Sequence, residues 1–151
     1  MTHIRDLHMS VDGRRLDGTD TLGAMTGEDK KRFDKIMQRL NMQGIDFDIR
    51  FHLHPDVDAA LDMGGTAVSL ALKSGEIWVF RHDGVGELKL EPSVYLESGR
   101  LKPRATRQIV LSGIVVDQAC QLSWTLAKAQ DTPAAIRDTE QDDPLSLTQG
   151  K

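Results

Sequence analysis

Histidine is the residue type whose spacing in this sequence points most directly to chemistry. His52 and His54 lie two positions apart in the segment FHLHP. In an extended strand, residues at i and i+2 share a face and lie roughly 7 Å apart. Two imidazoles so placed can hold a metal if a third ligand comes from elsewhere, or they can bind an anionic group together with Arg50. The alternative is that both are polar side chains on a solvated or helix-covered face.

A second candidate site is the basic segment GRLKPRATRQ, which carries Arg100, Lys102, Arg104 and Arg107. Such a strip can contact an anionic polymer through charge-assisted hydrogen bonds. The alternative is a solvated edge strand, because positive charge discourages edge-to-edge pairing.

Other reactive residue types have ordinary structural interpretations. His3 and Arg5 share one face of an extended segment, where an exposed pair is the default. Cys120 lies among alternating apolar residues, which favours a core position over a nucleophile. As the single cysteine it excludes an internal disulfide and a cysteine-only zinc site. Tyr95 lies at a strand end, where a structural role is more common. The motifs GxGxxG, GxxxxGK[ST] and GxSxG are absent.

Composition limits the classes of protein to which the chain can belong. With 151 residues the chain fits one domain, and its 19 basic against 23 acidic residues give a net charge of -4. This charge argues against a generally basic nucleic-acid binder. No apolar run approaches the ~20 residues of a membrane span, and the first residues lack the apolar stretch of a secretory signal. We therefore expect no nucleic-acid or membrane partner and leave the compartment open.

Alternation of apolar and polar residues predicts that most of the chain is β-strand. The clearest strand covers residues 45–53, where every odd position is apolar and every even position polar. Shorter strands are expected over 3–11, 14–22, 66–72, 76–81, 87–90, 94–96, 104–112 and 120–126. The first two predict a hairpin turning at Asp12-Gly13, with Asp17-Gly18 marking a bulge or another tight turn. From residue 45 to residue 126 the strands follow one another at turn signals with no helix between them, which predicts a mainly-β, antiparallel β-sandwich.

One amphipathic surface helix is predicted over residues 26–40, with Thr26 as its N-cap. Its apolar stripe is narrow, and basic residues line the rest: Lys30, Lys31, Arg32, Lys35 and Arg39. A surface helix docked on the sheet is preferred over a partner-binding helix. From about Gln130 the sequence is acidic and poor in large apolar residues, which predicts a disordered polar tail over 130–151 after a sandwich over 1–129.

Several segments taken together resemble a known family. In order and spacing, HIRDLHMSVDGRRLDGTDTL, IRFHLHPDV, SGEIWVFRHDG, LEPSVYLESG and RQIVLSG are similar to the C-terminal end of the bacterial heparinase II/III-like proteins. The resemblance covers residues 2–126, with the helix as a less typical insert. It implies a β-sandwich that follows an α/α toroid in polysaccharide lyases acting on uronic-acid-containing glycans. Their β-elimination needs a neutralised carboxylate, a base and an acid.

The resemblance also carries expectations for individual residues and partners. His3 matches a family metal ligand, so we expect zinc there only if residues outside this chain complete the site. No catalytic residue is assigned, because the toroid and the first part of the sandwich are missing. Acidic polysaccharide is the expected partner. The residues expected to bind it are Arg50, His52, His54, Arg104 and Arg107.

The chain is therefore expected to be the incomplete C-terminal β-sandwich of such a lyase, inactive alone. One alternative is a non-catalytic module that binds acidic glycan or has a structural role. Another is a companion subunit of a toroid-bearing chain, which would supply the missing sandwich edge by strand addition. The compartment stays unknown, although the family is often periplasmic or related to the cell envelope.

Overall fold

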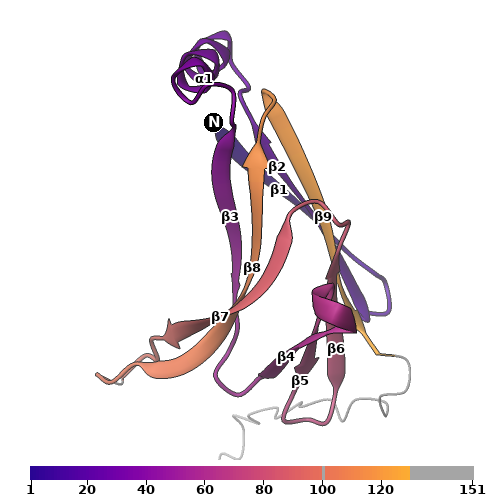
Figure 1. Cartoon of the computed structure of the whole chain (residues 1–151). Coiled ribbons are helices and arrows are strands. Elements are labelled where there is room, and N and C mark those ends of the chain that lie inside the picture. Colours follow the sequence, from indigo (N-terminus) through magenta and orange to yellow (C-terminus); the bar gives the residue numbers. More distant parts are fainter. Residues whose placement is uncertain (100, 130–151) are drawn as a thin grey trace, which may run out of the picture.

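The computed structural model describes residues 1–99 and 101–129, which form two antiparallel β-sheets and one long helix (Figure 1). The predicted tail at 130–151 lies outside the described residues. The elements in chain order are β1 (Thr2–Met9), β2 (Arg15–Gly23), α1 (Gly27–Arg39), β3 (Ile45–His52), β4 (Asp58–Asp62), a short 3-10 helix (Met63–Gly65), β5 (Ala67–Ala71), β6 (Ile77–His82), β7 (Glu87–Tyr95), β8 (Arg104–Val115) and β9 (Ala119–Lys128).

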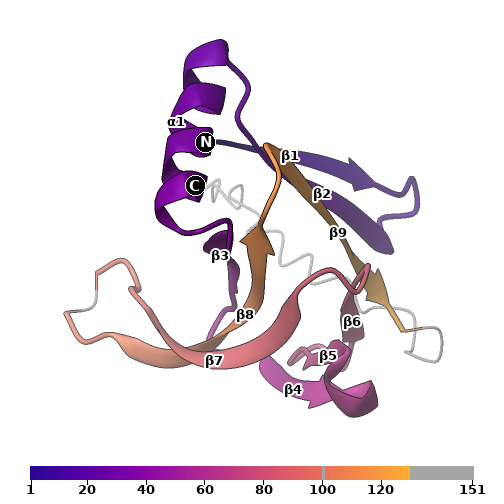
Figure 2. The ribbon, with the colours of Figure 1, turned by 45° about the horizontal axis from the view of Figure 1, so that its top comes forward.

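The two sheets face each other as a sandwich, which confirms the predicted fold class. The larger sheet has the strand order β1-β2-β9-β6-β5-β4, and the smaller has the order β3-β8-β7 (Figure 2). The smaller sheet does not cover the β1 edge, where every residue is exposed.

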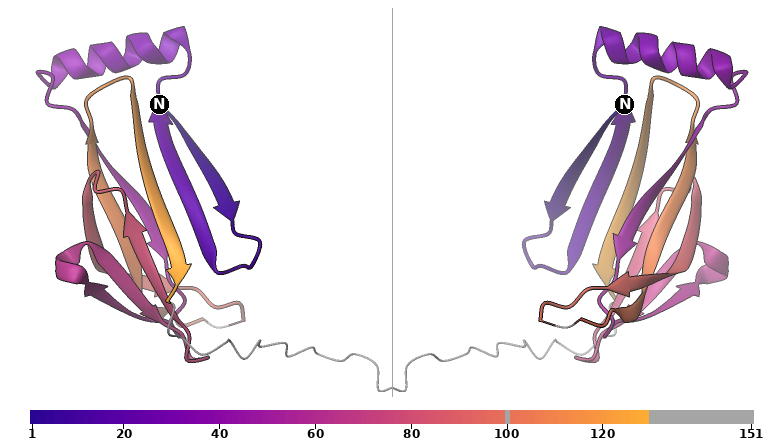
Figure 3. Two further views of the ribbon diagram at one scale, coloured as in Figure 1. Left: turned by 90° about the vertical axis from the view of Figure 1, so that its right-hand side faces the viewer. Right: turned by 90° about the vertical axis from the view of Figure 1, so that its left-hand side faces the viewer.

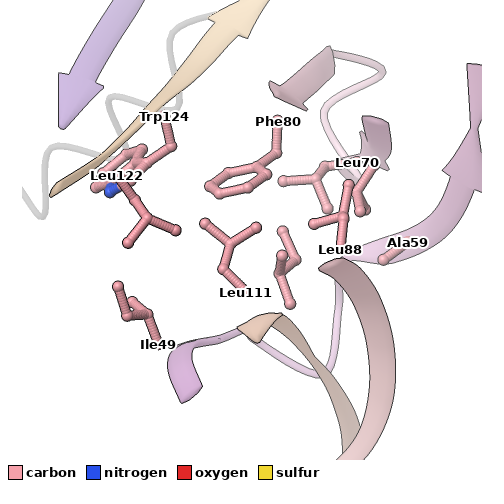
Figure 4. Packing of buried hydrophobic residues seen from close by; sticks show 10 residues of the cluster. Ile49, Ala59, Leu70, Phe80, Leu88, Leu111, Leu122 and Trp124 are labelled. Atoms are coloured by element: carbon pink, nitrogen blue, oxygen red, sulfur yellow. The ribbon is translucent and has the colours of Figure 1, made fainter. Parts of the chain in front are cut away.

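The core between the sheets is built from the inward-facing alternate residues of both. Figure 4 shows Trp124, Leu122 and Phe80 on one side facing Ile49 and Leu111 on the other. The Trp124 ring stacks on Phe80, with centroids 5.7 Å apart, and meets the ring of Phe51 from β3 edge-on at 4.9 Å. Aromatic contacts of this kind join β6 and β9 to β3 across the sandwich.

The predicted hairpin of β1 and β2 is confirmed, but the bulge or turn expected at Asp17-Gly18 is wrong. Pairing of β2 continues through these residues without a break on both sides. Gly18 serves a different purpose, because a Cβ there would lie 2.1 Å from the Trp124 ring. The glycine lets the indole lie flat over β2.

Two other strand predictions differ from the structure. Strand β4 is not among the predicted strands, because its segment DAALD has little alternation and pairs with only one neighbour, β5. The predicted strands 87–90 and 94–96 are separated at Pro92, whereas β7 is a single strand. Proline is tolerated there because β7 is an edge strand, where one side of the backbone needs no ladder hydrogen bond.

The predicted helix is confirmed as an element that covers one end of the sandwich (Figure 3). Thr26 caps it by accepting from the Asp29 backbone N–H, and the Asp29 side chain accepts from the Thr26 backbone in return. Phe33 and Met37 are buried in a second apolar cluster that includes Val115 of β8. No helix in the described residues is long and apolar enough to cross a membrane.

Candidate functional site

A buried carboxylate on the inner face of β2 organises the polar site of the molecule. Asp20 is fully buried, yet both of its oxygens accept hydrogen bonds. Arg5 donates to it twice, from Nε at 2.7 Å and from Nη2 at 3.1 Å. His3 Nε2 lies 2.5 Å from Oδ1, and Trp124 Nε1 donates to Oδ2 at 2.7 Å. Three side chains from two neighbouring strands therefore hold one carboxylate between the sheets.

The two-residue period of the strands explains this convergence. His3, Arg5 and Leu7 alternate along β1, and the register sets Arg5 opposite Asp20. Asp20 in turn pairs with Leu122 of β9, two residues from Trp124. Because Gly18 has no side chain, the indole of Trp124 can cross β2 and reach the Asp20 carboxylate.

Charge balance keeps Asp20 ionised inside the protein. Burial raises the pKa of its carboxyl, but the hydrogen bonds from Arg5, His3 and Trp124 outweigh that effect and leave the pKa below its ordinary value. An ionised carboxylate can only accept hydrogen bonds, so His3 carries its hydrogen on Nε2. The buried negative charge is compensated by the positive charge of Arg5.

A cleft opens beside this cluster, between the edge strands β1 and β3. Its volume is about 280 Å³, and it is lined by His3, Arg5, Leu22 and residues 47–50 of β3. The Arg5 guanidinium lies over two rings, 4.8 Å from the centre of Phe51 and 5.8 Å from that of Trp124. Among the described residues no partner is assigned to its Nη1. Arg5 is therefore a fixed cation with donors left for an anion.

The β3 residues predicted to bind substrate lie mostly outside this cleft. Arg50 lines its rim, but its guanidinium is bound to Asp48 at 2.6 Å and to Glu91 at 2.8 Å. His52 Nδ1 lies 2.9 Å from Ser93 Oγ of β7. These contacts place both side chains in a hydrogen-bonded network on the outer face of the smaller sheet.

The remaining predicted residues gather around Asp56, in the loop after β3. Arg104 Nη2 donates to the Asp56 carboxylate at 2.8 Å, and Lys73 Nζ lies 2.9 Å from its other oxygen. These bonds, from Lys73 first and then Arg104, lower the pKa of Asp56 to about 2. His54 accepts from the Asp56 backbone N–H and contacts the Tyr95 ring edge-on. The cations of this cluster are therefore balanced by carboxylates.

Among the described residues, Arg107 of the basic strip makes a contact separate from the Asp56 cluster. Arg107 Nη1 donates to the Ala59 carbonyl at 3.5 Å, a long contact. Arg100 lies outside the described residues. The structure thus distributes the predicted strip over separate contacts.

The described residues do not form a zinc site by themselves. Within residues 1–99 and 101–129, no group of three histidine, cysteine, aspartate or glutamate residues is placed to hold a metal ion. His3 does lie beside Asp20, but Arg5 occupies both oxygens of that carboxylate. Zinc in proteins takes at least about three protein ligands. A role for His3 as a zinc ligand completed by residues outside this chain stays a prediction.

Arg5, Asp20 and Trp124 are site residues that the sequence did not predict. The sequence does contain an indication of the role of Asp20. Its alternate neighbours in β2 are the apolar Leu16 and Leu22 and the small Gly18, so Asp20 is the one charged residue on that face. His3 and Arg5 lie on the exposed strand β1, as the expected surface pair does, and in addition they share one buried acceptor.

Cys120 packs against both apolar clusters, as its core interpretation predicted. Burial raises the pKa of its thiol. The reactive thiolate is therefore disfavoured at this position.

Comparison with known proteins places this chain in a family. The family model "Heparinase II/III-like, C-terminal" matches residues 1–125. The chain is also similar to the protein named "FtsZ-localized protein C" of Caulobacter vibrioides (strain NA1000 / CB15N), with 27% identity over 130 residues. That match covers 86% of this chain but 21% of the relative, so the chain spans about a fifth of the relative's length. The match over residues 1–125 shows that the chain belongs to the heparinase II/III-like C-terminal family.

Proposed function

We propose that this chain is the C-terminal β-sandwich part of a polysaccharide lyase that cleaves uronic-acid-containing glycans by β-elimination. In this proposal Arg5 binds a carboxylate of the glycan in the cleft between β1 and β3. The observation that carries the proposal is the fixed Arg5 guanidinium, which is bound to the buried Asp20 and lies over Phe51 and Trp124. The family match supports the same class of reaction.

The chemistry of elimination gives Arg5 a defined task. Removal of the proton next to a uronate carboxylate is helped when the charge of that carboxylate is neutralised by a positioned cation. Arginine suits this task because its planar donors match a carboxylate and its charge persists at every relevant pH. His3 adds a second polar group on the rim of the same cleft.

The acid and base of the reaction are proposed to come from a toroid-bearing polypeptide that packs against the open side of the sandwich. Leu7 and Met9 of β1, which share a face with Arg5, have 59% and 64% of their surface exposed. The edges of β1 and β3 can accept further strands. Among the described residues, no tyrosine lines the cleft, and Tyr95 contacts His54 instead. We therefore expect the chain to be inactive alone.

Binding of short uronate oligosaccharides to the purified chain tests the role of Arg5. At low ionic strength we expect saturable binding that falls about tenfold or more in Arg5→Gln, as the loss of a charge-assisted bidentate contact implies. The matched control is Arg14→Gln, which removes an exposed cation outside the cleft. Circular dichroism reports whether each variant is folded. Absence of binding by the wild type, or equal losses in both variants, would overturn the proposal.

Catalysis by the chain alone is tested with the same glycans. Release of unsaturated product, followed by ultraviolet absorbance, should stay at background. Turnover by the purified chain would show that the proposed dependence on a toroid-bearing polypeptide is wrong.

A second candidate function is that of a non-catalytic interaction module. It is favoured by the similarity to a protein named for its localisation with FtsZ. Cosedimentation of the chain with FtsZ polymers, without added glycan, distinguishes this candidate from the first. Cosedimentation that is unchanged in Arg5→Gln, together with no uronate binding by the wild type, would favour the second candidate.

A further inference from the structure

In the part of the chain that the structure describes, helix α1 carries a concentration of unpaired positive charge, whereas the cations of the sandwich are mostly paired with carboxylates. Its basic residues are Lys30, Lys31, Arg32, Lys35 and Arg39, all exposed. Only Arg32 has a carboxylate partner, Glu28, among the described residues. On the sandwich, by contrast, carboxylates balance Arg50 and Arg104. In a chain of net charge -4, this contrast makes α1 a local basic surface.

Lys31, Lys35 and Arg39 form a straight basic row along this helix. They are spaced four residues apart, so they share a face and follow one another at steps of about 6 Å. The opposite face of α1 carries the buried Phe33 and Met37. Because that face is anchored in the second apolar cluster, the basic row has a fixed outward orientation.

Accessible apolar side chains lie on both sides of the basic row. On one side of the helix, Ile36 and Leu40 keep 43% and 39% of their surface exposed. On the other, a groove of about 610 Å³ runs between α1 and the turn that joins β8 to β9. Phe33 and Met37 contribute to its lining, as do the more exposed Met42 and Val116. The rest of the lining is Gln38, the carboxylate of Asp117, and the carboxylate of Asp34, which accepts from Gln118 Nε2 at 3.1 Å.

We propose that α1 and this groove form a docking surface for an acidic peptide segment of a partner protein, with apolar side chains between its carboxylates. The carboxylates pair with the basic row, and an apolar side chain enters the groove. This surface lies outside the cleft of Arg5, so the inference goes beyond the proposed glycan function.

The apolar side chains decide between a peptide and other anionic occupants. A uronic-acid polymer would match the basic row, but it would leave Ile36, Leu40 and the groove unused. A flat anionic membrane would not fill a concave groove. Interfaces between proteins combine apolar and charged contacts, and α1 offers both, with the basic row lying between two apolar sides.

Fluorescence anisotropy with a labelled peptide of interspersed Glu and Leu residues tests this proposal on the full chain. We expect binding that weakens with salt and falls about tenfold in the double variant Lys31→Glu/Lys35→Glu, because attraction becomes repulsion. Met42→Ser should weaken binding without changing its salt dependence. The control is Arg14→Glu/Arg81→Glu, which makes the same change of charge at exposed positions off the helix. It should stay within about twofold of the wild type.

Competing occupants give distinct results in the same assay. The proposal would be overturned if both double variants lost peptide affinity equally. It would also be overturned if a peptide containing only Glu bound as tightly as the peptide of Glu and Leu. Tighter binding of heparan sulfate oligosaccharide or anionic vesicles would show that the occupant class is wrong. Residues 130–151 are themselves acidic in sequence, so a full-length variant with their Asp and Glu residues changed to Asn and Gln is compared. Peptide binding by that variant alone would identify this segment, not a partner, as the occupant.

Discussion

Two aspartates in this protein bind cations in similar ways but in opposite surroundings. Asp20 has no solvent exposure and accepts from Arg5, His3 and Trp124 between the sheets. Asp56 has 32% of its side chain exposed and contacts Arg104 and Lys73 at the surface. In both, hydrogen bonds lower the pKa of the carboxyl below its ordinary value, and burial opposes them, most strongly at Asp20.

The two clusters differ in what can solvate the remaining groups when the aspartate is removed. At Asp56, water can solvate a cation that loses its carboxylate, and surface ion pairs contribute little. At Asp20, loss of the carboxylate would leave polar groups of Arg5 and Trp124 without a partner in a confined site. The buried cluster can therefore fix Arg5 in place, whereas the exposed one joins the loop after β3 to β8 and to Lys73.

The largest effect that separates the two clusters is expected from Asp20→Ala. Removal of one partner from a buried ion pair costs about 3 kcal/mol of unfolding free energy. Asp56→Ala is the matched variant and should shift the urea midpoint much less. Equal shifts in urea unfolding followed by circular dichroism would show that burial does not distinguish the clusters.

A smaller effect on the same buried cluster is expected from Gly18→Ala. The new Cβ would lie 2.1 Å from the Trp124 ring and push the indole away from Asp20. Overpacking of this kind costs about 1–3 kcal/mol. The control Gly27→Ala places a methyl group where no atom lies within 4 Å. Loss of near-ultraviolet circular dichroism in the Gly18 variant alone would support the close packing of Trp124 on Gly18. Unchanged stability of that variant would contradict it.

The fold was largely predictable because strand alternation is a local signal. Residues 45–53 alternate without fault, and β3 lies there. The missed strand β4 has a weak local pattern and depends on pairing with β5. At Pro92 a local rule suggested a break, but the edge position of β7 removes the reason for it.

The site was less predictable, because its contacts join residues far apart in sequence. Sequence placed His3 and Arg5 on one face, but their acceptor, Asp20, is 15 residues from Arg5 and 104 residues from Trp124. Arg50 and Arg104 were selected for their charge. Asp48, which binds Arg50, lies in the same strand, but the other carboxylates that neutralise them, Glu91 of β7 and Asp56, come from other segments. The charge of a side chain follows from its residue type alone, whereas its ion-pair partner is known only once the fold is known.

The smallest expected effect concerns the exposed carboxylate of Asp56 and its dependence on pH. The folded pKa of Asp56 is about 2, against an ordinary 3.8, so its stabilising contribution is present above pH 3.8 and is lost as the pH falls toward 2. Asp56→Asn should therefore have a lower urea midpoint than the wild type at neutral pH, and the two midpoints should converge near pH 2. If the difference between the two urea midpoints stays constant with pH, the charge of Asp56 does not stabilise the folded protein. The variant should still lose stability in acid, because the pKa of Asp20 is also lowered and its contribution has the same sign.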